Sequence, residues 1–207
     1  STQTQTGQTF FRQLHTTFAN RYGYGLYISG KTYTELSNLN FLRYNYGIYY
    51  YSNSNNNTII GSPVCNSNNS CGIYYYSSSN NNTITGSPVC NSNSSGIYYY
   101  SNSNNNTIIG SPVCNSNNSC GIYYRSSNNN TITGSPICNS NSSYGIYYYN
   151  GSNNNVIYGT LTTSGNASGA IYNDFGINYI LKASIAESTK VTGFTDYANS
   201  RVFIGNM

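Results

Sequence analysis

The sequence predicts an all-β fold, a single-stranded parallel β-helix in which a short repeat winds into successive coils. The first observation is a Gly-Ile-Tyr-Tyr motif at spacings of 25, 24, 25 and 24 residues, which begins at Gly47, Gly72, Gly96, Gly121 and Gly145. The second is that each unit holds only short β-favouring runs between Asn, Ser and Gly turns. A unit of this length has no room for a βαβ crossover, so we expect it to form one coil.

A second block recurs within each unit. Thr-Ile-Ile-Gly-Ser-Pro-Val-Cys runs from Thr58 to Cys65, and similar blocks begin at Thr83, Thr107 and Thr131. Weaker copies of the repeat extend the series in both directions. We therefore expect about eight coils over residues 25–207, with the best repeats in 47–160 and degenerate coils at both ends, stacked ~4.8 Å apart.

Differences between copies of the first block predict which side chains point inward. Ile48 is the same in every copy, which indicates a core position. The fourth position of the motif holds Tyr51 in one copy and Arg125 in another, so it is expected to face solvent. By the two-residue period of a strand, Tyr49 then faces outward and Tyr50 faces inward.

The second block and the turns are interpreted in the same way. Ile59 is constant and is expected in the core, whereas Ile60 alternates with Thr between copies and is expected outside. Val64 and its copies are expected to form a third inner column. The turn residues 55–57 and their copies suit left-handed backbone, and stacked Asn side chains are expected to bond along the axis.

The N-terminal residues 1–24 break the repeat. Phe10, Phe11, Leu14 and Phe18 have helical spacing, so we expect a short capping helix over residues 9–20. The alternating segment 1–6 is expected to be a strand, suited to pairing with an open edge after residues 201–204. The expected organisation is thus an N-terminal strand and cap over 1–24 and a β-helix over 25–207.

The units Gly-Ile-Tyr-Tyr-Tyr-Ser and Asn-Asn-Asn-Thr-Ile-Ile-Gly resemble the NosD-type repeats of the pectin-lyase-like superfamily. The resemblance is close over residues 47–160 and weak elsewhere. It implies a right-handed β-helix, in a superfamily that includes carbohydrate-binding proteins and sugar hydrolases. The hydrolases use clustered Asp and basic residues, which this chain does not reproduce, so the resemblance is to a non-catalytic member.

Composition argues against most kinds of chemistry. The chain has 37 Asn, 32 Ser and 25 Tyr among 207 residues, but only 8 Lys+Arg, 4 Asp+Glu and one His, which is His15. The acids Glu35, Asp174, Glu187 and Asp196 lie at different offsets from the repeat Gly, so they form no acid–base pair. We expect no enzymatic activity, no cofactor and no metal. Scattered basic residues and the lack of a long apolar run predict neither nucleic-acid binding nor a membrane span.

The six cysteines suit an oxidising, extracellular location. Two disulfide schemes are open. One joins Cys65 to Cys71 and Cys114 to Cys120 across a turn, leaving Cys90 and Cys138 free. The other joins neighbouring coils, as in Cys65–Cys90 and Cys114–Cys138, because the coil spacing falls within the Cα range of a disulfide.

Asn-Xaa-Ser/Thr sequons occur ten times, and a repeat rich in these residues also generates them by chance. The sequons ending in Thr lead into the second strand, so those ending in Ser are preferred as glycan acceptors. The candidates are Asn68, Asn93, Asn117, Asn141, Asn150 and Asn166.

The outward tyrosines predict a broad interaction strip, since exposed aromatic surface usually marks an interface. Its members are Tyr49, Tyr51, Tyr74, Tyr76, Tyr98, Tyr100, Tyr123, Tyr147 and Tyr149. The strip, the low charge and the near-identical coils favour an extracellular structural protein that assembles with itself into a surface fibre or filament. The alternative is a carbohydrate-binding adhesin or viral tail-fibre-like β-helix that binds surface glycans. A polysaccharide-degrading enzyme is a remote alternative.

Overall fold

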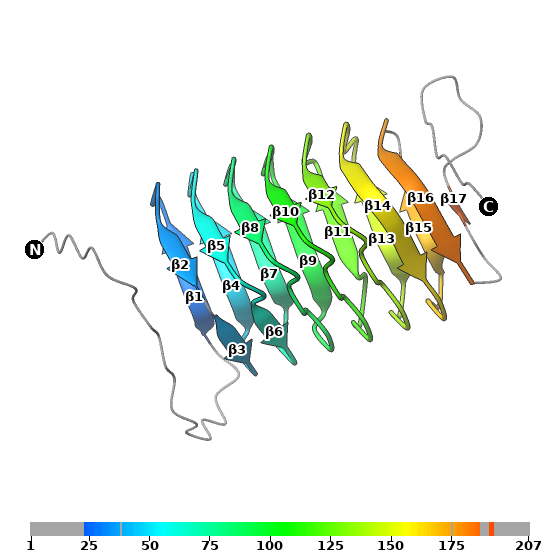
Figure 1. Cartoon of the computed structure of the whole chain (residues 1–207), viewed down its shortest axis with the longest axis horizontal. Helices are drawn as coiled ribbons and strands as arrows, with labels where there is room; N and C mark the ends of the chain where they lie inside the picture. The colour runs from blue at the N-terminus through cyan, green and yellow to red at the C-terminus, as the bar shows by residue number, and fades with distance from the viewer. Residues whose placement is uncertain (1–22, 38, 175, 187–190, 193–207) are drawn as a thin grey trace, which may run out of the picture.

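The computed structural model describes residues 23–37, 39–174, 176–186 and 191–192, and it shows a rod of stacked coils (Figure 1). Each strand lies beside its counterpart in the next coil, and the named strand pairs of the described region are all parallel. The predicted all-β parallel solenoid is therefore confirmed. The cap expected over residues 9–20, the strand over 1–6 and the edge after 201–204 lie outside the described residues.

The larger sheet has eight strands, each from a different unit of the repeat. In spatial order they are β1 (Tyr24–Ser29), β4 (Tyr46–Tyr51), β7 (Cys71–Tyr76), β9 (Ser95–Tyr100), β11 (Ile122–Arg125), β13 (Tyr144–Tyr149), β15 (Gly169–Asn173) and β17 (Val191–Thr192). The middle strands all come from the Gly-Ile-Tyr-Tyr motif. This sheet carries the tyrosine columns.

The second sheet has seven strands and contains the Thr-Ile-Ile or Thr-Ile-Thr segments. In spatial order they are β2 (Glu35–Ser37), β5 (Thr58–Ile60), β8 (Thr83–Thr85), β10 (Thr107–Ile109), β12 (Thr131–Thr133), β14 (Val156–Thr163) and β16 (Tyr179–Ile185). A third line of pairing joins β3 (Asn40–Leu42) to β6 (Val64–Asn66), and single bridges continue it through Val89, Val113, Ile137 and Thr162.

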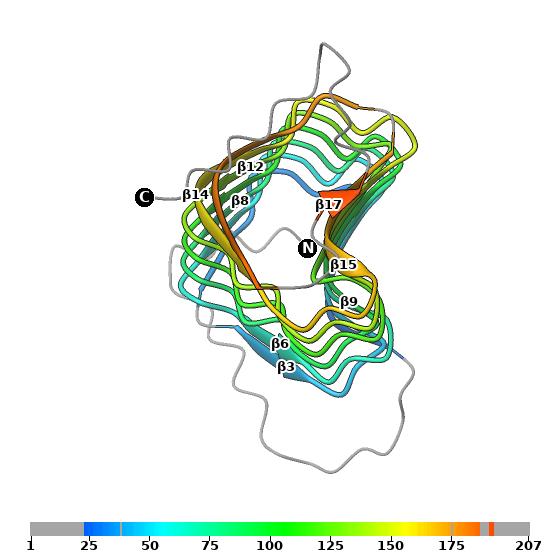
Figure 2. The same ribbon diagram turned by 90° about the vertical axis from the view of Figure 1, so that its right-hand side faces the viewer.

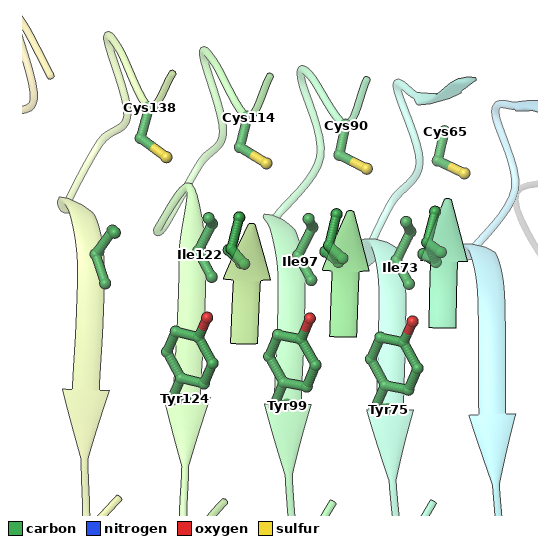
Figure 3. Close-up of a cluster of buried hydrophobic side chains, with 14 of the residues drawn as sticks. Cys65, Ile73, Tyr75, Cys90, Ile97, Tyr99, Cys114, Ile122, Tyr124 and Cys138 are labelled. Atoms are coloured by element: carbon green, nitrogen blue, oxygen red, sulfur yellow. The ribbon is translucent and has the colours of Figure 1, made fainter. Parts of the chain in front are cut away.

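The register places identical residues beside one another. Ile122 pairs with Ile97 on one side and with Ile146 on the other. The core is thus built from columns of one residue type, with isoleucine, tyrosine and cysteine running along the rod (Figure 3). Stacking identical apolar side chains in this way buries them completely, which stabilises every coil against its two neighbours.

The third inner column differs from expectation. Val64 and its copies are only half-buried, whereas the flanking Pro63 and Cys65 are buried. The prediction of an inner valine column was therefore wrong. The two-residue period holds here, but the inward positions are those of proline and cysteine.

Two columns of buried asparagine bond the coils together. In the first, each Nδ2 donates to the Oδ1 of the next coil at 2.9–3.1 Å, through Asn57, Asn82, Asn106, Asn130, Asn155 and Asn178. In the second, each backbone N–H donates to the Oδ1 of the next coil, through Asn68, Asn93, Asn117, Asn141 and Asn166. The predicted asparagine ladder is confirmed, and it lies partly inside the rod.

Two glycine positions allow coils to stack closely. Gly110 has a φ of 147°, and a Cβ there would lie 2.1 Å from the carbonyl oxygen of Gly86. At Gly96 a Cβ would lie 2.8 Å from the Cβ of Cys114, so the glycine of the motif makes room for the cysteine column. Only glycine fits both the backbone and the space at Gly110.

Candidate functional site: the outer tyrosine face

The candidate site is the outer surface of the eight-stranded sheet, where tyrosine side chains gather. Viewed down the rod, the outline of the coil turns inward along β9 and β15 (Figure 2). In β9, Tyr99 is fully buried, whereas Tyr98 and Tyr100 lie on the other side of the strand. The nine predicted tyrosines and Arg125 are the outward residues of β4, β7, β9, β11 and β13. We call them the outer tyrosine face.

The rings of this face stack along the rod. Consecutive ring centroids are 5.0, 5.0, 4.5 and 4.8 Å apart, with interplanar angles of 12°, 23°, 1° and 7°, through Tyr49, Tyr74, Tyr98, Tyr123 and Tyr147. A parallel second column contains Tyr51, Tyr76 and Tyr100. Because each ring covers the flat side of the next, the face presents ring edges and hydroxyl groups to its surroundings.

This stacking changes the expected exposure. Tyr49 and Tyr74 point away from the core, as predicted, but each is only 8% exposed. Tyr46, Tyr51 and Tyr76 pack around them and form a small cluster separate from the main core. The prediction that Tyr49 and Tyr74 face solvent was therefore wrong. The two-residue period of a strand predicts the side on which a residue lies, but it does not predict that neighbouring rings cover it.

Arg125 takes the place of one tyrosine in the second column. Its guanidinium carbon lies 4.8 Å from the ring centroid of Tyr100 and 5.6 Å from that of Tyr149. The neighbouring Tyr98 also interacts with this guanidinium and raises its pKa. The cation is thus held between two rings, where cation–π attraction replaces ring stacking.

Burial controls ionisation on this face. It raises the pKa of Tyr98 to about 12, although the neighbouring Arg125 acts in the opposite direction. Burial also raises the pKa of Tyr147 to about 12, with a further increase from Tyr172. These phenols stay neutral and act as hydrogen-bonding groups at physiological pH.

The six cysteines are all buried and none of them forms a disulfide, so neither predicted disulfide scheme occurs in the structure. Cys65 lies in the main core, whereas Cys71 belongs to the cluster with Tyr49 and Tyr74 on the outer face. The wall of the coil separates these two thiols. The sulfurs of Cys65, Cys90, Cys114 and Cys138 follow one another in a file (Figure 3).

The structure reverses the preference among the sequons. Five of the six preferred acceptors are buried within the rod, namely Asn68, Asn93, Asn117, Asn141 and Asn166. Only Asn150 is exposed, and its Nδ2 donates to the hydroxyl of Ser126. The preference for sequons that end in Ser does not match the burial of these five asparagines, because the turn before Ser directs them inward.

Within the described residues, no group of three or more His, Cys, Asp or Glu side chains lies close enough to hold a metal ion. Glu35 lies on β2 and Asp174 follows β15, near opposite ends of the rod (Figure 1). The other acids, Glu187 and Asp196, and His15 lie outside the described residues. The described residues contain no helix that is long enough and apolar enough to cross a membrane.

Comparison with known proteins supports the fold from a separate direction. Residues 63–161 match a family model described as "periplasmic copper-binding protein (NosD)". A comparison with curated proteins found no match. The matched region covers the regular coils between β6 and β14, whose repeat units carry the resemblance to NosD-type repeats. The chain is therefore a parallel β-helix repeat protein, and its regular coils are similar to the repeats of the NosD family.

Proposed function

We propose that this protein is a structural component of the cell envelope or cell exterior, a subunit that assembles end to end into a fibre. The matching family is described as periplasmic, which supports a location outside the cytoplasm. The observation that carries the proposal is the in-register repetition of strands, asparagine ladders and ring stacks along one axis. Such a pattern can continue from one molecule into the next.

Both ends of the described rod offer strand edges. Among the described residues, β1 and β2 pair on one side only, as do β16 and β17 at the other end. The carbonyl of Thr34 accepts a hydrogen bond from Thr58 of β5, and backbone groups alternate in direction along a strand. The N–H of Glu35 therefore points away from β5, toward the position of an added strand.

The geometry of the outer tyrosine face favours assembly over sugar binding. A sugar ring packs on the flat side of an aromatic ring, and these flat sides are covered by neighbouring tyrosines. The exposed edges and hydroxyls suit lateral packing between rods instead. The carbohydrate-binding alternative is therefore the weaker of the two.

We do not extend copper binding to this chain. The best sulfur ligands, Cys65, Cys90, Cys114 and Cys138, lie in a line along the rod rather than around one point. Burial raises the pKa of Cys90 and Cys114 well above the usual range, which opposes the thiolate form that binds metal. The described residues thus do not fit a copper centre, and the proposed role requires no catalysis.

The test is the length of the particles formed by the purified full chain. Electron microscopy and sedimentation across a concentration series should show rods longer than one molecule. Glu35→Pro should shorten them, because proline removes one edge donor without touching the β2–β5 ladder. Glu35→Ala removes the same charge but keeps the N–H, so its rods should match those of the unmodified chain. Persistent monomers of the unmodified chain at high concentration would overturn the proposal.

A further inference from the structure

The described chain contains two sets of sequons that differ in environment. Both sets repeat once per coil, about half a coil apart. The inner set ends in Ser and begins at Asn68, Asn93, Asn117 and Asn141. The outer set ends in Thr and begins at Asn56, Asn81, Asn105 and Asn129. Because the repeat is shared, the two sets act as controls for each other.

The inner set is closed to modification in the folded chain. Asn117 is fully buried, its Nδ2 donates to the Oδ1 of Asn141 at 2.9 Å, and its Oδ1 accepts the backbone N–H of Asn93. A glycan on this nitrogen has no space inside the rod. It would also break the ladder that joins neighbouring coils.

The outer set is open. Asn56, Asn81, Asn105 and Asn129 are all exposed, and their backbones are left-handed with φ of 56–57°. This conformation turns each side chain away from the coil. Their backbone N–H groups bond to the next coil, as from Asn105 to the carbonyl of Asn128, but no hydrogen bond of their side-chain amides is found in the described structure. The amide nitrogen is therefore available without loss of a structural contact.

The position also suits a large hydrophilic group. These residues lie in the turn between the two large sheets, before β5, β8, β10 and β12, so carbohydrate there leaves the outer tyrosine face uncovered. Only 6% of the chain is charged, which provides little electrostatic hydration. Glycans along one corner of the rod would supply hydration and limit association to the remaining faces.

We propose that Asn56, Asn81, Asn105 and Asn129 form a column of N-glycosylation sites. The donor is a lipid-phosphate-linked oligosaccharide supplied by the glycosylation machinery of an exporting cell. The asparagine Nδ2 bonds to C1 of the first sugar and gives up one proton. The bond between C1 and the phosphate oxygen breaks, and the lipid phosphate leaves with the electron pair. Neighbouring acceptors lie one strand spacing apart, so crowding limits occupancy, and a glycan at any of the four supports the proposal.

The test is site mapping on the full chain secreted from a eukaryotic cell that performs N-glycosylation. Chymotryptic cleavage after tyrosine gives the peptide of residues 52–74, which holds one outer acceptor, Asn56, and one inner acceptor, Asn68. Enzymatic release of the glycan in isotopically labelled water then marks the modified asparagine for mass spectrometry. We expect label on outer acceptors of the folded, soluble chain.

Two matched variants separate the sets. Changing Thr58, Thr83, Thr107 and Thr131 to Val removes the outer sequons, keeps β-branched residues and should abolish label at the four outer positions. Changing Ser70, Ser95, Ser119 and Ser143 to Ala removes the inner sequons and should leave the labelling unchanged. Sugar transferred to the inner sites before folding would lower the yield of folded chain. The second variant prevents this transfer, so the outer sites can still be mapped. Label on inner acceptors of the folded chain, label at Asn150 alone, or no label at all would overturn the proposal.

Discussion

Asn105 and Asn106 are neighbours of the same residue type in opposite environments. Asn106 is fully buried and bonds to Asn82, Asn130 and the carbonyl of Ser79, whereas the side chain of Asn105 is exposed. The same contrast separates the inner Tyr99 from the outer Tyr98. In this rod, the function of a residue depends on its side of the coil wall more than on its type, and the following predictions test that difference.

The largest effect is expected from the two asparagines. Asn106→Gly should lower the free energy of unfolding by about 4 kcal/mol, because it leaves buried groups of two neighbouring coils unpaired. Asn105→Gly should change it by less than ~0.5 kcal/mol, because glycine adopts the left-handed backbone without strain. Urea unfolding followed by circular dichroism measures both. Equal losses would show that the inner ladder does not hold the coils together.

Alkaline pH should unfold the rod. Burial raises the pKa of the Cys71 thiol to about 12 from an ordinary value near 9, and it raises that of Tyr98 to about 12 from near 10. Folding therefore favours the protonated forms, so their contribution to stability is complete below about pH 9 and is lost as the pH rises toward 12. We expect phenolate absorbance to appear together with unfolding. Free titration of most tyrosines near pH 10 in a folded rod would contradict this.

Removing single hydroxyls should have opposite effects on the two tyrosine columns. The hydroxyl of Tyr99 is buried without a hydrogen-bond partner in the structure, so Tyr99→Phe should raise the free energy of unfolding by about 1 kcal/mol. The hydroxyl of Tyr98 interacts with the neighbouring Arg125 cation, so Tyr98→Phe should lower the free energy of unfolding by about 1 kcal/mol. Thermal and urea unfolding report both values. A loss of stability in Tyr99→Phe would instead indicate bridging water along the inner column.

An effect no larger than this is expected at Arg125. Arg125→Ala should lower the free energy of unfolding by about 1 kcal/mol, because it removes the cation between Tyr100 and Tyr149. Arg125→Tyr introduces the residue that both neighbouring coils carry, and its free energy of unfolding should stay within ~0.5 kcal/mol of the original. If both variants lose the same stability, the column does not depend on continuous stacking.

Much of the fold was predictable because one repeat samples the same environment many times. Constancy of Ile48 and Ile59 indicated the core, and the Tyr/Arg exchange at position 125 indicated the outer side. The site was predictable in membership, since the structure brings the nine tyrosines together. Its covering by stacked rings was not predictable, because ring-to-ring contact depends on the exact coil register. The inner column of Pro63 and Cys65 was missed because valine was assumed to be the buried residue.

The sequence by itself determined the period of the coil, the parallel stacking and the identity of most core columns, because a strand with a two-residue period has only two sides. Only the tertiary structure decided which asparagines face inward, which thiols share a compartment and which rings cover one another. These depend on the turns, where left-handed residues such as Asn105 reverse the direction of the next side chain and no simple period applies. For this reason the burial of the sequon asparagines, which lie in the turns, could not be predicted from the sequence and was decided by the tertiary structure.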